Sequence, residues 1–302
     1  MADMNNIDLI EKLNREVIEL KKSKEYTIGQ KVIKFIDAIK HGNFFKLIQA
    51  LKSKFIEKKV PINISKELYY KQGKDLKSRG VVYTCITGGY DLPKEALYDD
   101  ENLDYILYTD NLQSKLIGKW NLRSVTNLGF YGKGNLINRF CKMNPFILFS
   151  NKKYDFAIYI DGNVQIVSNV SRLYSLAKQS NLGIAVHRHF ARDCIYDEAV
   201  ACNLLKKGNK ESIIRQMQKY KQEGFPSHFG LYEATIIVVD LHNKHAKNVL
   251  EYWWKEYLDS QSMRDQLALP YVIWKNGFNF NDIGDLGNNL YKNPKFRIYL
   301  HK

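Results

Sequence analysis

From residue 81 onward, short runs rich in β-branched residues alternate with longer stretches of helical periodicity, and this alternation constrains the fold most. The strand-like runs are 81–87, 105–109, 156–160, 164–167, 183–186 and 235–239. The helix-like stretches are 136–149, 170–179, 196–206, 212–222, 244–257 and 264–274. Strands that alternate with helices indicate an α/β domain of the Rossmann type, with a mixed, mostly parallel sheet flanked by helices.

The first 80 residues have a different pattern and are predicted to form a basic helical extension to the domain at 81–302. Within 5–24, Ile10, Leu13, Val17 and Leu20 follow the three–four spacing of an amphipathic helix. Such a helix can pair with a second copy in a short coiled coil, which would make a homo-oligomer, or it can pack on its own chain.

Segment 26–80 is strongly basic, with 13 Lys or Arg and 4 Asp or Glu, in a chain of net charge +14 at pH 7. Basic amphipathic helices can lie on an anionic membrane surface, where each cation adds about 1 kcal/mol. The alternative is that the apolar faces pack on the α/β domain and the lysines are merely solvated. No nucleic-acid partner is expected, because much of the charge lies outside the α/β domain and no nucleic-acid-binding motif is present.

The chain has no apolar run near the roughly 20 residues of a membrane span, and residues 1–20 lack the apolar segment of a signal peptide. Cys85, Cys141, Cys194 and Cys202 lack CxxC spacing, so a zinc knuckle is disfavoured and free thiols are expected. These features predict a cytoplasmic protein, which could still bind the inner face of a membrane.

Polar residues follow the first two strand-like runs, where open α/β sheets bind their ligands. The motif Thr87-Gly88-Gly89-Tyr90-Asp91 comes after the first run, and paired glycines let the backbone turn sharply beside a ligand. The tyrosine could stack on a base and the aspartate could accept from a ribose, or the motif is a plain turn. The residues predicted to line a nucleotide pocket are Tyr83, Thr84, Thr87, Tyr90, Asp91 and Asp110.

Asp161-Gly162-Asn163 ends the buried run 156–160 and is the candidate metal site. Two oxygen-bearing side chains, bent by a glycine, can hold one Mn²⁺ or Mg²⁺, and such an ion can bridge a nucleotide diphosphate. Asp-Gly and Gly-Asn are also hairpin-turn dipeptides, so a structural turn is the alternative.

Cations and carboxylates elsewhere complete the candidate site. Arg139, Lys142 and His187 are predicted to face the phosphates of a donor, although a surface salt bridge is the alternative for each. Glu233 and Asp265 are the candidates for activating an acceptor or positioning the reacting sugar. Asp265 opens a predicted helix, where a carboxylate also serves as a favourable first-turn charge.

The order of these motifs is more specific than any one of them. The segments are 83–91, 104–110, Trp120, 138–145, 159–163, 192–199, 223–226, 230–233 and 264–266. Together they resemble the glycosyltransferase-like domain family shared by plant mucilage and pectin-related proteins and by bacterial capsule or lipopolysaccharide proteins. The resemblance covers about residues 81–274 and leaves the N-terminal extension outside.

This resemblance implies a GT-A fold and a nucleotide-sugar donor. It places Asp161-Gly162-Asn163 where such enzymes keep an Asp-x-Asp, with Asn163 as a departure that removes one negative charge. Asp265 and Gln266 look like the Asp-Gln element near the donor sugar, so Gln266 joins the donor-binding residues. The function that follows is metal-assisted transfer of a sugar to a surface-polysaccharide or lipid-linked acceptor. The alternative is a catalytically silent scaffold of the same fold.

Overall fold

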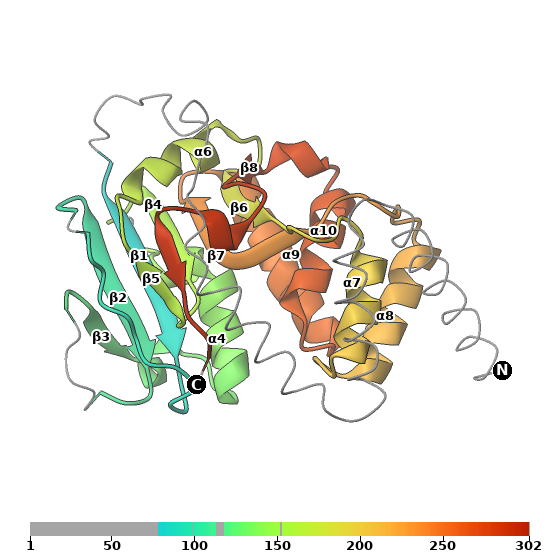
Figure 1. The fold of residues 1–302 in the computed structure, drawn as a ribbon, viewed down its shortest axis with the longest axis horizontal. Coiled ribbons are helices and arrows are strands. Elements are labelled where there is room, and N and C mark those ends of the chain that lie inside the picture. The colour runs from blue at the N-terminus through green and yellow to red at the C-terminus, as the bar shows by residue number, and fades with distance from the viewer. Residues whose placement is uncertain (1–77, 99, 113–117, 152, 302) are drawn as a thin grey trace, which may run out of the picture. The chain divides into compact units, whose positions relative to one another are not determined.

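The structure is a computed structural model, and it describes residues 78–98, 100–112, 118–151 and 153–301 (Figure 1). Its strands are β1 (Gly80–Ile86), β2 (Leu103–Thr109), β3 (Asn121–Ser124), β4 (Phe156–Ile160), β5 (Val164–Ile166), β6 (Ile184–Arg188), β7 (Tyr232–Asp240), β8 (Gly284–Asp285) and β9 (Phe296–Ile298). Its α-helices are α4 (Gly134–Met143), α5 (Pro145–Leu148), α6 (Tyr174–Gln179), α7 (Ile195–Leu204), α8 (Lys210–Gln222), α9 (Lys244–Ser260) and α10 (Asp265–Lys275). Short 3₁₀ turns join several of them.

The main sheet has seven strands in the order β3-β2-β1-β4-β7-β6-β8. Strands β3, β2, β1 and β4 are parallel to one another, β7 runs antiparallel to both β4 and β6, and β8 is parallel to β6. A small second sheet pairs β5 with β9 in antiparallel fashion. The predicted α/β fold with a mixed, mostly parallel sheet is therefore confirmed.

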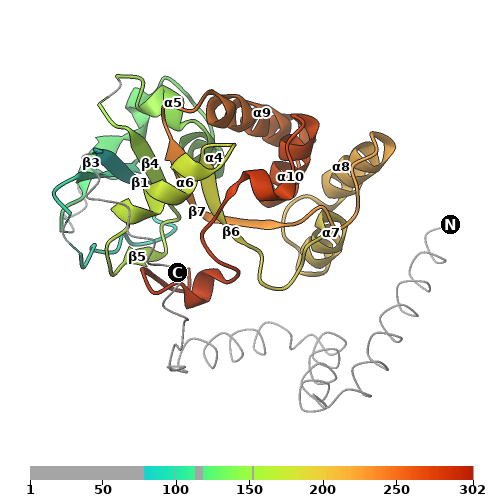
Figure 2. The ribbon, with the colours of Figure 1, turned by 90° about the horizontal axis from the view of Figure 1, so that it is seen from above.

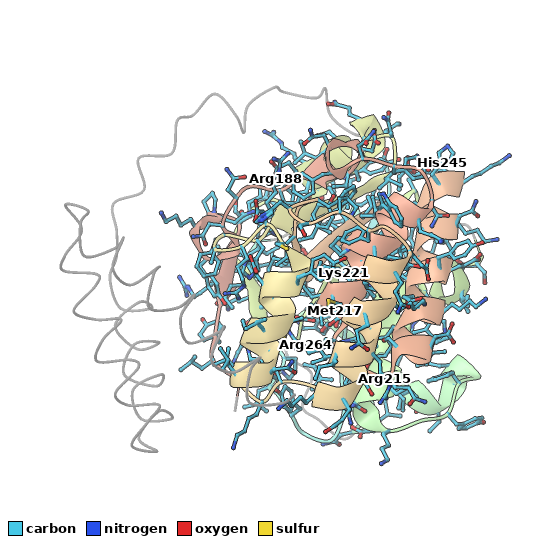
Figure 3. All side chains as sticks on the ribbon, turned by 90° about the vertical axis from the view of Figure 1, so that its right-hand side faces the viewer. Arg188, Arg215, Met217, Lys221, His245 and Arg264 are labelled. Atoms are coloured by element: carbon cyan, nitrogen blue, oxygen red, sulfur yellow. The ribbon has the colours of Figure 1, made fainter. Side chains whose placement is uncertain are left out.

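Both faces of the central strands are buried, which explains why β1 and β4 consist of almost uninterrupted apolar residues. One face packs on α4, α9 and α10, and the other packs on α6 and the small sheet. Helices α7 and α8 pack on each other at the end of the domain away from β3 (Figures 1 and 2). Figure 3 looks onto this end, where Met217 of α8 packs against the core.

The predicted helix 136–149 is wrong in one respect, because the structure divides it into α4 and α5. Asn144 leaves the helical region (φ −121°, ψ 48°) and Pro145 opens the next helix. Proline has no amide hydrogen to donate and disfavours helical geometry in the residue before it, so a break falls at this pair. Strands β3, β8 and β9 are short and were not predicted from the sequence pattern.

Strand β1 begins at Gly80, whereas the predicted division placed the α/β domain at 81–302, and this division stays a prediction. The amphipathic helix at 5–24 and most of the basic segment 26–80 lie outside the described residues. The proposed helical extension, its coiled coil and its membrane contact therefore stay predictions.

Candidate functional site

The candidate site lies at the side of the main sheet where β1, β4 and β6 end and β7 begins. Polar residues that flank the ends of these strands meet there. Strands β1 and β4 are parallel, so Thr87 and Asp161 follow their carboxyl ends at the same edge. Strand β7 is antiparallel to β4 and begins there, with the Asp161 amide donating to the Thr235 carbonyl at 3.0 Å. Glu233 near the start of β7 pairs with the end of β6, so both strands contribute to this edge (Figure 1).

Asp161 is the acidic tip of β4, and its side chain is partly accessible. Its Oδ1 accepts a hydrogen bond from the Tyr159 hydroxyl at 2.9 Å and lies 3.8 Å from Lys142 Nζ. Gly162 comes next because a Cβ at this position would lie 2.8 Å from the Ile86 side chain. The glycine therefore lets the turn after β4 approach the end of β1 closely.

Asn163, the second predicted metal ligand, is 7% exposed and has one satisfied and one unsatisfied polar atom. Its Nδ2 donates to the Tyr299 carbonyl at 2.7 Å, whereas its Oδ1 is buried without a hydrogen-bond partner. A buried acceptor without a donor is costly, and a cation would satisfy it. This orphaned oxygen, with the Asp161 carboxylate two residues away, fits a divalent metal of the Mn²⁺ or Mg²⁺ class.

Asp91 and His301 form a pair beside this turn that sequence reasoning did not find. His301 Nδ1 lies 2.8 Å from Asp91 Oδ2, and the Asp91 Cβ would lie 3.3 Å from a Cβ at Gly162. The segment that ends in His301 is held there because the Tyr299 amide donates to the Asn163 carbonyl at 2.9 Å. His301 therefore brings an imidazole to the predicted metal site.

Lys142, Arg139 and Asp265 form a buried ion cluster on the other side of Asp161. Lys142 Nζ donates to Asp265 Oδ2 at 2.7 Å, and Arg139 Nε lies 3.2 Å from the same oxygen. Burial alone would raise the pKa of Asp265, but the charges of Arg139 and Lys142 outweigh it and hold the pKa well below its usual value. Asp265 is thus a permanent anion that fixes two cations next to Asp161.

Gln266 stands next to Asp265 and has a structural contact. Its Nε2 donates to the Tyr232 carbonyl at 2.9 Å, which ties the start of α10 to the start of β7. The Trp253 indole donates to the Asp265 carbonyl at 2.8 Å and ties the same turn to α9. Because Gln266 follows Asp265 and Tyr232 precedes Glu233 in the sequence, the bond between Gln266 and Tyr232 holds the Asp265 cluster close to Glu233.

Glu233 lies in a different environment from Asp265, close to the imidazole of His189 and the carboxylate of Glu198. Burial raises the pKa of Glu233, and the Thr235 hydroxyl, which donates at 3.1 Å, only partly offsets the effect. His189 Nε2 lies 4.0 Å from both Glu233 Oε2 and Glu198 Oε2. Because His189 Nδ1 accepts from the Arg192 amide at 3.0 Å, the ring hydrogen is on Nε2 and faces the two carboxylates.

The glycine loop after β1 is held from two sides. The Gly88 amide donates to Asp110 Oδ2 at 2.8 Å, so the two predicted nucleotide-binding motifs are in contact. A Cβ at Gly134 would lie 2.6 Å from the Thr87 hydroxyl, which places that hydroxyl at the first residue of α4. Tyr90 is 63% exposed, and its ring centroid lies 5.1 Å from that of His301. The loop therefore presents an aromatic face beside the predicted metal site.

Three of the predicted donor-binding residues are not brought to this surface. Tyr83 is fully buried and packs edge-on against Phe149 and Tyr159, and Thr84 is buried in the same strand. His187 is also fully buried, with Asn293 Nδ2 at 2.8 Å from its Nε2, and burial lowers its pKa to about 4. These side chains belong to the packed interior rather than to the accessible surface of the candidate site.

Two exposed aromatic side chains that sequence reasoning missed stand beside Glu233. Phe190 is 57% exposed and stacks on His189, and Tyr291 is 63% exposed with its ring centroid 6.0 Å from that of Phe190. Partial desolvation and, to a smaller degree, the charge of Glu233 raise the pKa of Tyr291, so this tyrosine lies within electrostatic range of Glu233 although its ring is largely exposed. Phe190 and Tyr291 therefore form an aromatic rim beside the cluster of Glu233, His189 and Glu198.

Residues 75–297 match the family model described as TOD1/MUCI70, glycosyltransferase-like domain. The chain belongs to this family, as the ordered sequence motifs predicted. The match begins just before β1 and includes each of the site residues above except His301, which lies beyond its end.

Solved structures similar to this chain include several glycosyltransferases at low identity. The apo form of mouse xyloside xylosyltransferase 1 matches with 10% identity and a TM-score of 0.40, over 66% of this chain and 82% of that chain. The bifunctional WbbM glycosyltransferase matches with 14% identity and a TM-score of 0.44, over 76% of this chain and 47% of that chain. Core-mannan synthase A of Aspergillus fumigatus, in a Mn/GDP form, matches with 7% identity and a TM-score of 0.38, over 68% of this chain and 72% of that chain.

These similarities are weak in both sequence and superposition, so the family assignment rests on the family model. A comparison with curated protein sequences gave no match. Among the described residues, none of the helices is both long enough and apolar enough to cross a membrane.

Proposed function

We propose that this chain transfers a sugar from a nucleoside-diphosphate sugar to a hydroxyl of a surface-polysaccharide or lipid-linked glycan. The observation that carries the proposal is the meeting of Asp161, the Lys142–Asp265–Arg139 cluster and Glu233 at one edge of a GT-A sheet. Preorganised cations can stabilise a departing diphosphate, and a carboxylate with a raised pKa can accept the proton of an acceptor hydroxyl.

The donor is assigned to the side of the site between β1 and α4. Tyr90 offers a ring face for a base, and Asp91 and Asp110 hold the loop that carries it. Lys142 and Arg139 supply positive charge for a diphosphate, and Asp265 keeps both of them in place. Preorganised cations of this kind stabilise the charge that develops on a departing diphosphate.

A Mn²⁺ or Mg²⁺ ion would be held by Asp161 and Asn163, with His301, which pairs with Asp91 beside this turn, as a further candidate ligand. When bound, such an ion supplies charge neutralisation on the diphosphate. The single charge of Asp161 in place of two aspartates suits an ion that is shared with the donor's phosphates rather than one held by the protein alone.

Glu233 is assigned to the acceptor. In the transfer the bond between the sugar's anomeric carbon and the diphosphate oxygen breaks, the acceptor oxygen bonds to that carbon, and the acceptor's proton passes to Glu233. A base works best when its pKa is near the working pH, and burial moves Glu233 in that direction. Phe190 and Tyr291 give flat apolar faces against which the C–H face of an acceptor sugar ring can pack.

A thermal-shift screen of nucleotide sugars with and without Mn²⁺ tests the proposal. A donor at 100 times its dissociation constant stabilises the native state by about 2.7 kcal/mol, so the unfolding midpoint should rise. Asp161→Ala should abolish this rise. Asp155→Ala, at the opposite end of the same strand, is the matched control and should retain it. If no nucleotide sugar shifts the wild type under either condition, the proposal is wrong.

A catalytically silent scaffold is the second candidate, and Asn163 in place of a second aspartate is the observation that favours it. Slow hydrolysis of the stabilising donor in the presence of Mn²⁺ separates the two functions. An enzyme of this type turns over its donor with water as acceptor, whereas a scaffold binds the donor and leaves it intact.

The location and assembly of the protein are separate proposals. A cytoplasmic protein that binds the inner face of a membrane through the basic segment 26–80 would be close to lipid-linked acceptors. Self-association through the helix predicted at 5–24 would present two such sites together.

A further inference from the structure

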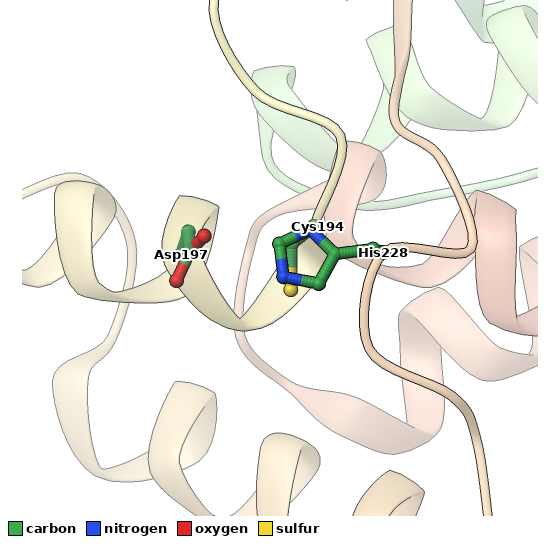
Figure 4. A group of neighbouring side chains, drawn as sticks. All are labelled: Cys194, Asp197 and His228. Carbon is green, nitrogen blue, oxygen red and sulfur yellow. The ribbon is translucent and has the colours of Figure 1, made fainter.

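A second cluster of ligand-type side chains lies at the start of α7, formed by Cys194, Asp197 and His228 (Figure 4). One ligand atom from each residue lies within 4.8 Å of the others, and no other trio of His, Cys, Asp or Glu in the described part of the chain does so. We propose that this cluster binds Zn²⁺ or a similar thiol-preferring divalent ion, independently of the sugar-transfer site.

The chemistry of the three ligands selects this class of ion. A thiolate, an imidazole and a carboxylate are the donors that zinc takes in proteins, whereas Mn²⁺ and Mg²⁺ prefer oxygen alone. Two atoms bound about 2.2 Å from a tetrahedral ion lie about 3.6 Å apart, so the cluster has to close by about 1 Å at most. Rotation of the exposed Asp197 side chain, with a small tilt of the His228 ring that keeps its hydrogen bond to Asp193, can supply that movement, and a water would complete the tetrahedron.

Cys194 occupies a position where its thiol does not serve the helix. It is the N-cap residue of α7, where Ser, Thr, Asp or Asn normally accept from the first-turn amides, yet it makes no side-chain cap hydrogen bond. The residue is only 3% exposed. In Figure 4 its sulfur lies next to the imidazole of His228, on the side from which Asp197 approaches. A buried thiol aimed at two other ligands is the arrangement that a soft divalent ion requires.

His228 is oriented by a carboxylate that is not part of the cluster. Asp193 Oδ1 lies 2.9 Å from His228 Nδ1, so the opposite ring nitrogen is the one presented to Cys194. Carboxylate–histidine–zinc arrangements of this kind fix the tautomer and increase the basicity of the ligating nitrogen. His242 pairs with Asp155 at the same 2.9 Å but has no cysteine beside it, which makes it a natural control.

The backbone around the cluster is already held in place. The Gly230 amide donates to the Asp193 carbonyl at 2.8 Å, and the Tyr196 hydroxyl donates to the Phe225 carbonyl at 2.9 Å. Binding would therefore need little rearrangement. An ion here would link the start of α7 to the loop that leads into β7, and hence to the strand that carries Glu233.

The electrostatic balance also favours a cation. The amino end of α7 contributes about half a positive charge, which opposes metal binding. Asp193 and Asp197 together contribute two negative charges at the same place, and the nearest arginine, Arg192, is already paired with Glu198.

Zinc titration of the full chain in competition with a chromophoric chelator tests the proposal. We expect one Zn²⁺ per chain that remains in Asp161→Ala, since the two sites are separate. Cys194→Ser and His228→Gln should each weaken binding at least tenfold, and Asp193→Asn should weaken it by about 10-fold to 100-fold. His242→Gln should bind as the wild type does.

Cobalt substitution gives a second readout that does not depend on stability. Thiolate ligation produces a sulfur-to-cobalt charge-transfer absorption, which should be present in the wild type and in His242→Gln and absent in Cys194→Ser. Failure of the wild type to bind Zn²⁺, or unchanged binding by the Cys194→Ser and His228→Gln double variant, would overturn the metal site. Neither result would bear on donor binding, which the Asp161→Ala thermal shift measures separately.

Discussion

The two carboxylates assigned to the reacting centre, Asp265 and Glu233, lie in environments that move their pKa values in opposite directions. Asp265 is enclosed by Lys142 and Arg139 and stays ionised, whereas Glu233 is half-buried with less compensation for its charge and holds its proton more tightly. Environments that separate two carboxyl pKa values also separate their chemical roles. In the proposed transfer, Asp265 would therefore position the cations that meet a diphosphate, and Glu233 would exchange a proton.

Replacing Glu233, the carboxylate proposed to accept the acceptor's proton, should have the largest effect, and that effect should fall on the rate of transfer. Glu233→Gln keeps the size of the side chain and removes its basicity, so kcat should fall by about 10²-fold to 10⁴-fold. The donor-induced thermal shift should be unchanged, because Glu233 is not assigned to the donor. Glu251→Gln, on the exposed face of α9, is the matched control.

The pH profile of transfer refines the same prediction. The base must be deprotonated to act, so the rate should fall as pH decreases through the raised pKa of Glu233, above the usual carboxyl value of about 4.3. Glu233→Gln should lose this acid limb. An acid limb that persists unchanged in the variant would assign proton transfer to another group.

Removing the charge of Asp265 should act mainly on stability. Asp265→Asn removes the closest anionic partner of Arg139 and of Lys142, whose side chain is 4% exposed, and leaves Lys142 only the more distant Asp161 carboxylate; we expect a loss of about 3–5 kcal/mol in the free energy of unfolding. Urea denaturation measures this loss, with Asp259→Asn at the exposed end of α9 as control.

The sign of the pH dependence distinguishes this role from that of Glu233. Because the folded-state pKa of Asp265 is depressed, its stabilisation is complete above its unfolded value of about 3.9 and is lost only as pH falls below that value. The stability difference between wild type and Asp265→Asn should therefore be the same at pH 7 and pH 5. A difference that already shrinks at pH 5 would show that Asp265 is not held as a permanent anion.

The sequence predicted those parts of the site that lie within one local segment and missed those formed by distant segments. The run 156–160 predicted the bounds of β4, because five consecutive apolar residues end at Asp-Gly, and the motif order predicted the family. Contacts that close the site join distant positions, such as Lys142 with Asp265 and Asp91 with His301. No local pattern carries such pairs, so the role of His301 was missed.

Residues inside a strand posed a different difficulty. Tyr83 is the central residue of β1 and His187 is next to the last residue of β6, and both side chains are buried in the packed interior. Alternation along a strand assigns a face only when one face is polar, and β1 is buried on both. The aromatic rim of Phe190 and Tyr291 was missed for the complementary reason, because an exposed aromatic residue in a loop has no periodic pattern.

Substitutions in the aromatic rim of Phe190 and Tyr291 should have the smallest effect. They test whether donor and acceptor bind on separate sides of the site. Phe190→Ala removes one exposed ring worth about 1 kcal/mol to a stacked partner, so the acceptor KM should rise about fivefold. The donor KM and donor hydrolysis should not change, because water needs no aromatic platform. Tyr291→Phe keeps the ring and should leave the acceptor KM near the wild-type value, whereas Tyr291→Ala should raise it as Phe190→Ala does. An equal rise in donor KM in the two alanine variants would mean that the rim serves both substrates, and Glu233 would then lie between donor and acceptor rather than on the acceptor side.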